Sequence, residues 1–87
     1  MHEFSLIQNL MKKLELISES HEGKKLVGVK VKLGAFSHIS AEHFREHFVH
    51  AARGTTAEDA ELEVEESKDE QDPHAQDIIL ESVQVEV

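Results

Sequence analysis

The sequence has 87 residues, no cysteine, and 9 Lys and Arg against 18 Asp and Glu, a formal net charge of −9. This length fits one domain, and the charge disfavours nucleic acid and anionic membrane surfaces as partners. The lack of cysteine excludes disulfides and thiolate metal sites from these residues. It also fits the reducing cytoplasm, and the opening M-H-E lacks the basic and apolar regions of a signal peptide.

Two segments have the apolar periodicity of an amphipathic helix. The first covers residues 4–20 and ends before Gly23, which suits a left-handed helix cap. Its apolar stripe consists of Ile7, Leu10, Leu14 and Ile17, widened by Phe4 and Met11. The second covers residues 40–53, with Ser37 or Ser40 as its N-cap. Its predicted inward stripe is Ala41, Phe44, Phe48 and Ala51.

Three segments alternate between apolar and polar residues as β-strands do. In residues 26–33 the alternation predicts an inward face made of Val27, Val29, Val31 and Leu33. In residues 60–66 the alternation predicts that two apolar side chains face inward and that the glutamates face outward. The last segment, residues 78–87, loses its alternation over residues 78–80, which predicts either a β-bulge or a stretch that is buried on both faces there.

The order α-β-α-β-β predicts an α+β fold with a three-stranded sheet and two helices on one face, because that arrangement buries every apolar stripe. Lys30 and Lys32 on the wet face are expected to pair with glutamates of a neighbouring strand. Residues 67–77 are acidic and hold the only proline, so we expect a loop or a disordered bridge. Residues 1–87 are expected to form one domain, as a monomer or a weak dimer through an unpaired edge strand.

The N-terminal residues form the first group of candidate metal ligands. Because methionine is normally removed only before a small residue, we expect Met1 to keep a free α-amine in front of His2. That amine, the His2 backbone nitrogen and the His2 imidazole can chelate one ion in a plane, with Glu3 adding a further donor. Planar nitrogen donors favour Ni(II) or Cu(II) over Zn(II). A histidine after methionine is also common as a simple exposed residue, so both interpretations stay open.

His43, His47 and His50 form the second group. Around the axis of the second predicted helix they fall within about 60° of one another, on the border between core and solvent. Histidines four residues apart can bind one divalent metal, but a polar flank without a ligand has the same pattern. The segment H-F-R-E-H lacks the glutamate of the HExxH motif, and no phosphate loop or nucleophile motif is present, so we expect no enzyme. A metal hydrolase built on His43 and His47 is the weakest alternative.

Four sequence blocks resemble, in this order, the HypA/HybF family of hydrogenase maturation factors. They are M-H-E-F-S-L, V-K-L-G-A-F-S, A-R-G-T-T-A-E-D-A-E-L-E-V-E-E and S-V-Q-V-E-V. The resemblance implies a cytoplasmic nickel metallochaperone that delivers Ni(II) to a hydrogenase large-subunit precursor with the help of a maturation GTPase, and that in some organisms also serves urease. It further implies that His2 is the principal nickel ligand, flanked by Met1 and Glu3.

The chain departs from the family pattern in two places. Family members carry a zinc ribbon with two CxxC pairs between the last two strands, whereas this sequence has residues 67–77 there and no cysteine, so zinc is not expected. Either the chain is a natural variant without the ribbon, or the ribbon was deleted. Some relatives also carry an acidic residue near the start of the second helix, where the matching region here is residues 38–42. Ser40 cannot replace a carboxylate, which leaves His38 and Glu42 as the possible accessory ligands.

Two functions from different classes follow from these observations. The first is a nickel metallochaperone. The second is a metal-independent adaptor that binds a maturation GTPase or a hydrogenase subunit, because the missing ribbon and the acidic surface are compatible with a protein that kept only its docking role.

Overall fold

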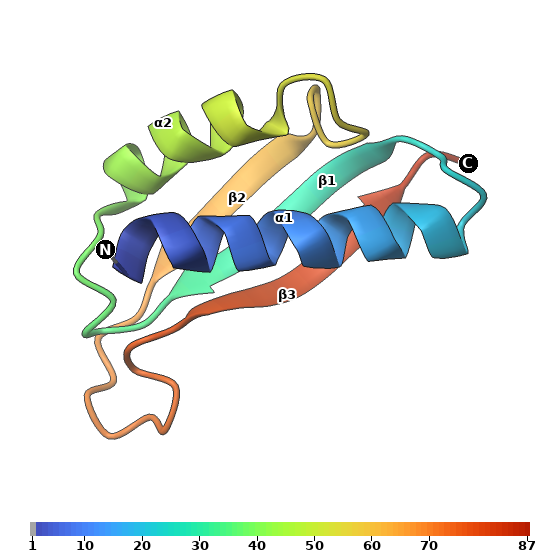
Figure 1. Cartoon of the computed structure of the whole chain (residues 1–87). Coiled ribbons are helices and arrows are strands. Elements are labelled where there is room, and N and C mark those ends of the chain that lie inside the picture. The colour runs from blue at the N-terminus through green and yellow to red at the C-terminus, as the bar shows by residue number, and fades with distance from the viewer. Residues whose placement is uncertain (1) are drawn as a thin grey trace.

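The computed structural model describes the backbone of residues 2–87 and the side chains from Ser5 onward. It contains two helices and three strands in the predicted order: α1 His2–Ser20, β1 Leu26–Leu33, α2 Ala41–Ala52, β2 Glu61–Glu66 and β3 Ile78–Val85. The strands form one mixed sheet in the order β2-β1-β3, in which β1 runs parallel to β2 and antiparallel to β3. Both helices lie on the same face of this sheet (Figure 1), which confirms the predicted α+β fold.

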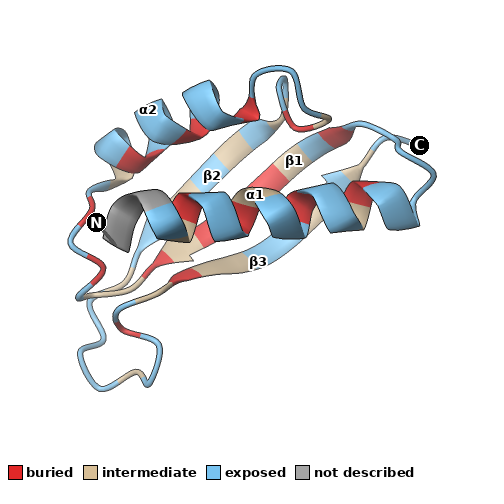
Figure 2. Cartoon of the chain, in the orientation of Figure 1, coloured by how far each residue is buried: buried red, intermediate tan, exposed pale blue. Residues whose placement is uncertain are grey.

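The core lies between the two helices and the sheet, where the buried residues face one another in Figure 2. The predicted stripe of α1 is confirmed at Ile7, Leu10 and Leu14. In α2 the aromatic pair Phe44 and Phe48 is almost fully buried. The third inward residue of α2 is Ala52, so the prediction of Ala51 was wrong. Residues spaced by four from Phe44, which include position 52, face the sheet, because α2 keeps the same face toward the sheet over its three turns.

The inward face of β1 differs from the prediction at its first residues. Val27 is 44% exposed, whereas Leu26 beside it is buried. The pairing of β1 with β3 shifts between Leu26 and Gly28, so Val27 occupies an irregular position in the strand. An extra residue of this kind reverses which side chains face inward, and from Val29 onward the predicted alternation holds.

A second register shift explains the unclear alternation in β3. Lys30 pairs with Ser82 and Val31 with Leu80, so Glu81 has no partner of its own on β1. Before Glu81 the side chains at even-numbered positions therefore face the core, and after it those at odd-numbered positions do. The burial of Ile78 and the partial burial of Val83 show this change. The predicted bulge exists, but it lies at Glu81 and not at residues 78–80.

Residues 67–77 form a loop that is attached to the turn after β1, which corresponds to the first of the two predicted alternatives. The Gly34 amide donates a hydrogen bond to the Asp77 carbonyl oxygen at 2.9 Å, and the Phe36 amide donates to the Ala75 carbonyl oxygen at 2.6 Å. Ala75 is buried at this contact. A short apolar anchor and two backbone bonds thus hold an otherwise polar loop against the end of the sheet.

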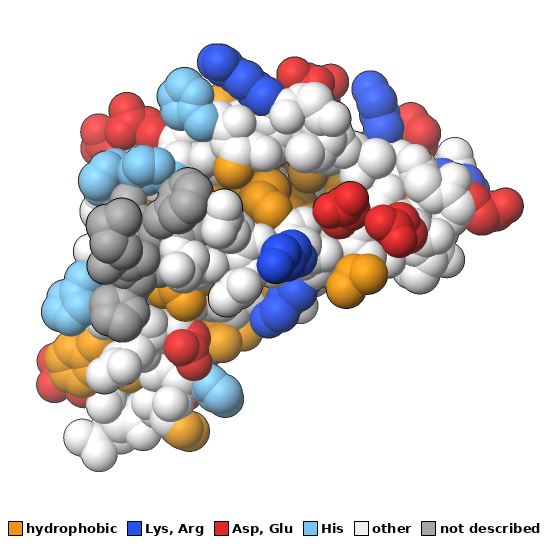
Figure 3. All heavy atoms as spheres, in the orientation of Figure 1, with side chains coloured by type: hydrophobic (Ala, Val, Ile, Leu, Met, Phe, Trp, Pro, Cys, Tyr) orange, Lys and Arg blue, Asp and Glu red, His pale blue; other side chains and the backbone are white. Residues whose placement is uncertain are grey.

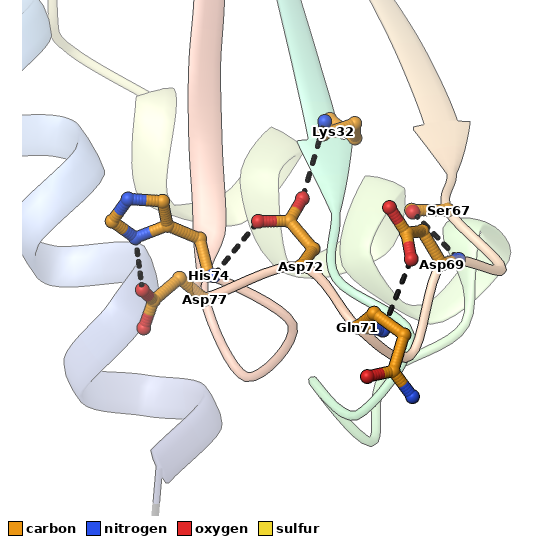
Figure 4. A network of polar contacts seen from close by, with 7 residues as sticks. All are labelled: Lys32, Ser67, Asp69, Gln71, Asp72, His74 and Asp77. Carbon is orange, nitrogen blue, oxygen red and sulfur yellow. Dashed lines mark hydrogen bonds and ion pairs between the residues drawn. The ribbon is translucent and has the colours of Figure 1, made fainter.

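Side chains add to this attachment (Figure 4). One oxygen of the Asp72 carboxylate accepts a hydrogen bond from the His74 amide at 2.9 Å, and the other lies 3.6 Å from the Lys32 ammonium. The His74 ring lies 3.1 Å from the Asp77 carboxylate. Lys32 was expected to pair with a strand glutamate, but it pairs with this loop, whereas Lys30 pairs with Glu63 of β2 at 3.5 Å.

Acid should weaken the attachment of this loop. The amide hydrogen bond from His74, together with the nearby Lys32 charge, lowers the pKa of Asp72 below its ordinary value. A carboxyl group whose pKa is lower in the folded state stabilises that state above its unfolded pKa of about 3.9, and this contribution is lost as the pH falls further. Urea denaturation should therefore show Asp72→Asn less stable than the parent at pH 7, with the difference shrinking toward pH 3. Glu70→Gln, in the same exposed loop, is the control; a difference for Asp72→Asn that is constant with pH would contradict the assignment.

Candidate metal-binding residues

The predicted N-terminal ligands lie at the boundary of the described part of the chain. Met1 is outside the described residues, as are the side chains of His2 and Glu3, so their predicted roles stay predictions. The backbone places His2 at the first position of α1. Because the first four amide groups of a helix have no intrahelical acceptor, the backbone nitrogens of this turn are not needed by the helix itself. That condition suits a backbone nitrogen that would bind a metal.

The two helices begin at the same end of the molecule (Figure 1). Figure 3 shows histidine side chains on the surface around the N-terminal end of α1 and over α2. His38 lies in the turn before α2 and Glu42 lies in the first turn of that helix, and both are exposed. The fold therefore brings the two predicted accessory ligands to the end of the molecule where α1 starts, although they lie about forty residues away in the sequence.

His38 has an unusual backbone conformation for a residue that is not glycine. Its φ is 60°, in the left-handed region that histidine adopts more readily than most residues. The two residues on either side of it, Ser37 and Ile39, are buried. The turn thus points two side chains into the protein and leaves the imidazole of His38 outside, at the start of α2.

Three contacts fix the first turns of α2. Ser40 is the N-cap, and its hydroxyl accepts a hydrogen bond from the His43 amide at 3.1 Å. The Glu66 carboxylate accepts a hydrogen bond from the Ala41 amide at 2.6 Å, and the Arg45 guanidinium donates to the Leu62 carbonyl oxygen at 2.8 Å. The sequence could suggest Ser40 as the cap, but not Glu66, which lies on β2 far along the chain. These contacts hold the candidate ligands of α2 in place.

His43 and His47 are brought together by the helix. Their ring centroids lie 4.7 Å apart with the rings tilted by 45°. Both are exposed, and so is His50, and the first two directly precede the buried Phe44 and Phe48 in the sequence. Among the described side chains, no three His, Asp or Glu residues lie close enough to form a complete metal site.

The described part of the chain also has no helix that is long and apolar enough to cross a membrane.

The fold and these side chains define a small two-layer α+β domain with imidazoles at the end where both helices begin. Imidazole groups are suitable ligands for nickel, copper and zinc. A family profile described as hydrogenase/urease nickel incorporation, metallochaperone, HypA, matches residues 1–72. The chain therefore belongs to the HypA family, which confirms the resemblance seen in the sequence blocks.

Individual relatives agree with this assignment. A hydrogenase maturation factor HypA from Nitrosospira multiformis is 35% identical over 65 residues, which covers 75% of this chain and 56% of that protein. The HypA of Escherichia coli K12 is 34% identical over 70 residues, covering 80% and 60%. The HypA of Desulfitobacterium hafniense is 34% identical over 65 residues, covering 75% and 57%. The chain thus aligns with little more than half the length of these relatives.

The family match ends inside the loop of residues 67–77. It stops at residue 72, between β2 and β3. Beyond it, β3 still returns to pair with β1. Within these 87 residues β2 and β3 are joined by this loop, which contains no cysteine.

Proposed function

We propose that the chain is a nickel metallochaperone that binds Ni(II) through its N-terminal residues and delivers it during the maturation of a nickel enzyme. The observation that carries the proposal is the family match, which begins at residue 1 and so includes the M-H-E segment with its candidate ligands. The family description names nickel incorporation for hydrogenase and urease. Hydrogenase is the proposed recipient, because the relatives described above are named as hydrogenase maturation factors.

The proposed site uses the imidazole of His2, the backbone nitrogen of His2 and the α-amine of Met1, with Glu3 as a fourth donor. Four donors of this kind are arranged in a plane, and planar nitrogen-rich sites are typical of Ni(II) and Cu(II). His38 and Glu42 are the proposed accessory residues, since the structure places both at the end of the molecule where α1 starts. No thiolate is present in these 87 residues, so the proposal includes no zinc.

Removal of His2 should strongly weaken nickel binding. Calorimetric titration of the tag-free chain with Ni(II) should show one high-affinity site with one-to-one stoichiometry, and His2→Ala should lower the affinity of that site by at least about tenfold, which corresponds to about 1.4 kcal/mol. His21→Ala is a matched control, because His21 is an exposed histidine just past the other end of α1. Equal losses in the two variants, or no loss in His2→Ala, would rule out the N-terminal site.

A chain with one extra residue before Met1 separates the role of the amine from that of the imidazole. The extension converts the α-amine into an amide and displaces the terminal charge, but it leaves His2 in place. The proposal expects weaker Ni(II) binding by this variant than by the parent, and unchanged affinity would remove Met1 from the ligand set.

The alternative function is a metal-independent adaptor for a maturation GTPase or a hydrogenase large-subunit precursor. It is favoured by the acidic outer residues of β2, where Glu61, Glu63 and Glu65 are exposed and could meet a basic partner. Pull-down of a purified maturation GTPase with and without Ni(II) distinguishes the two. Capture that depends on neither nickel nor His2 supports the adaptor, whereas loss of capture in His2→Ala supports the metallochaperone. In both cases the proposed place of action is the cytoplasm.

A further inference from the structure

The exposed face of α2 carries a histidine pair that the proposed N-terminal site does not use. Phe44 and Phe48 are buried under α2, with exposed fractions of 0% and 2%, and they fix how the helix is rotated on the sheet. His43 and His47 each precede one of these anchors, so both are held on the same side of the helix. Their ring centroids lie 4.7 Å apart.

This spacing suits two ligands of one metal ion. A nitrogen ligand lies about 2.0–2.1 Å from zinc, so two nitrogens on one ion of this size can be separated by at most roughly 4 Å. Ring nitrogens that face each other across centroids 4.7 Å apart can reach that separation by rotation of the side chains. Histidines four residues apart on one helix face are also the arrangement by which zinc peptidases hold their metal. The backbone of α2 is therefore already shaped for chelation.

The charges around the pair favour a cation. In α2 the only Lys or Arg is Arg45, and its guanidinium is held at the Leu62 carbonyl on β2. At 100° per residue, Arg45 lies on nearly the opposite side of the helix from His43, whereas Glu46 lies about 60° from it. Figure 3 shows acidic side chains near the histidines of this region. The net charge of −9 attracts cations to the chain in general.

We propose that His43 and His47 form a second transition-metal site, which binds one divalent ion of the nickel, copper and zinc class through two imidazole nitrogens. The two imidazoles supply two of the ion's ligands, fewer than the four donors of the proposed N-terminal site, so the site on α2 is expected to be the weaker of the two. The site goes beyond the proposed function, since it needs neither Met1 nor His2 and exists whether or not the chain delivers nickel.

The test measures this site in the His2→Ala background, so that it does not depend on the N-terminal site. Calorimetric titration of tag-free His2→Ala with Ni(II) should show one weak site. Adding His43→Ala or His47→Ala should lower its affinity by about tenfold, because the effective concentration that the second imidazole supplies is lost. Adding His50→Ala, which removes a neighbouring exposed histidine of the same helix, should change the affinity less than twofold.

A folding control accompanies each variant. All three replacements put alanine at exposed helical positions, where alanine has the highest helix propensity, and circular dichroism should show unchanged helix content. Thermal unfolding with and without Ni(II) gives a second measure, because a ligand that binds only the folded state raises the midpoint. The rise seen for His2→Ala should disappear when His43 and His47 are both replaced. Absence of Ni(II) binding in His2→Ala, or equal binding with and without the pair, would overturn the proposal and leave the N-terminal proposal intact.

Discussion

Replacing Phe44 with alanine should remove a large part of the protein's stability. Phe44 is fully buried in the core and lies beside Phe48, with 6.1 Å between ring centroids and the rings tilted by 36°. Replacing a buried phenylalanine with alanine costs about 3–5 kcal/mol, because apolar contacts are lost and a cavity remains. A domain of this length has a total stability of roughly 4–13 kcal/mol, at about 0.05–0.15 kcal/mol per residue. Urea denaturation monitored by circular dichroism measures the loss.

Val49→Ala provides the matched control for Phe44→Ala. Val49 lies on the same helix and also loses side-chain carbon, but it is 52% exposed. Its replacement should change the free energy of unfolding by less than about 0.5 kcal/mol, as is usual for surface positions. A similar loss in the two variants would mean that α2 does not pack on the sheet through its phenylalanines.

Gly34→Ala should detach the loop of residues 67–77 from the end of the sheet. A Cβ atom at this position would lie 2.5 Å from the Ala75 carbonyl carbon and 2.7 Å from the His74 carbonyl oxygen. Both are backbone atoms, which cannot move aside as a flexible side chain can. Overpacking of this kind costs about 1–3 kcal/mol or more, and the Gly34 amide would lose its bond to Asp77. Urea denaturation should report the loss, and hydrogen exchange should show faster exchange at the amides of residues 34 and 36.

Gly28→Ala tests whether the effect at Gly34 is specific to a backbone obstacle. A Cβ atom at Gly28 would also be crowded, at 2.8 Å from an atom, but that atom is the side-chain oxygen at the end of Gln84. Gln84 is exposed and can adopt another rotamer, so the cost should be clearly smaller than at Gly34. Equal costs at the two glycines would contradict the close approach of the two loops.

The order and type of the secondary-structure elements could be predicted because each apolar stripe has the period of its element. Errors occurred where one extra residue interrupts the period, at Val27 and Glu81. The sequence contains no local signal for the first and only the lost alternation over residues 78–80 for the second, since the position of the extra residue is defined by the register with the partner strand. The inward position of Ala52 likewise depends on how α2 is rotated on the sheet, which Phe44 and Phe48 decide together.

The loop of residues 67–77 shows a different limit. Its composition is that of a disordered segment, and its order depends on Gly34, Phe36 and Lys32, more than thirty residues earlier in the chain. Composition alone cannot reveal such partners. For the metal ligands, spacing predicted that His43 and His47 share a helix face, which the ring geometry agrees with. That His38 and Glu42 lie at the end where α1 begins follows from the topology and not from any local pattern.

Proton NMR of the tag-free chain with one equivalent of Ni(II) tests the central claim most directly. A planar nitrogen-rich Ni(II) complex is diamagnetic, whereas an ion that keeps water in a six-coordinate shell is paramagnetic and broadens nearby signals. The N-terminal site predicts a spectrum that stays sharp, with new signals confined to the first turns of α1 and absent in His2→Ala. A spectrum without change, or broadening centred on α2 while the signals of α1 stay in place, would contradict nickel binding at the N-terminus.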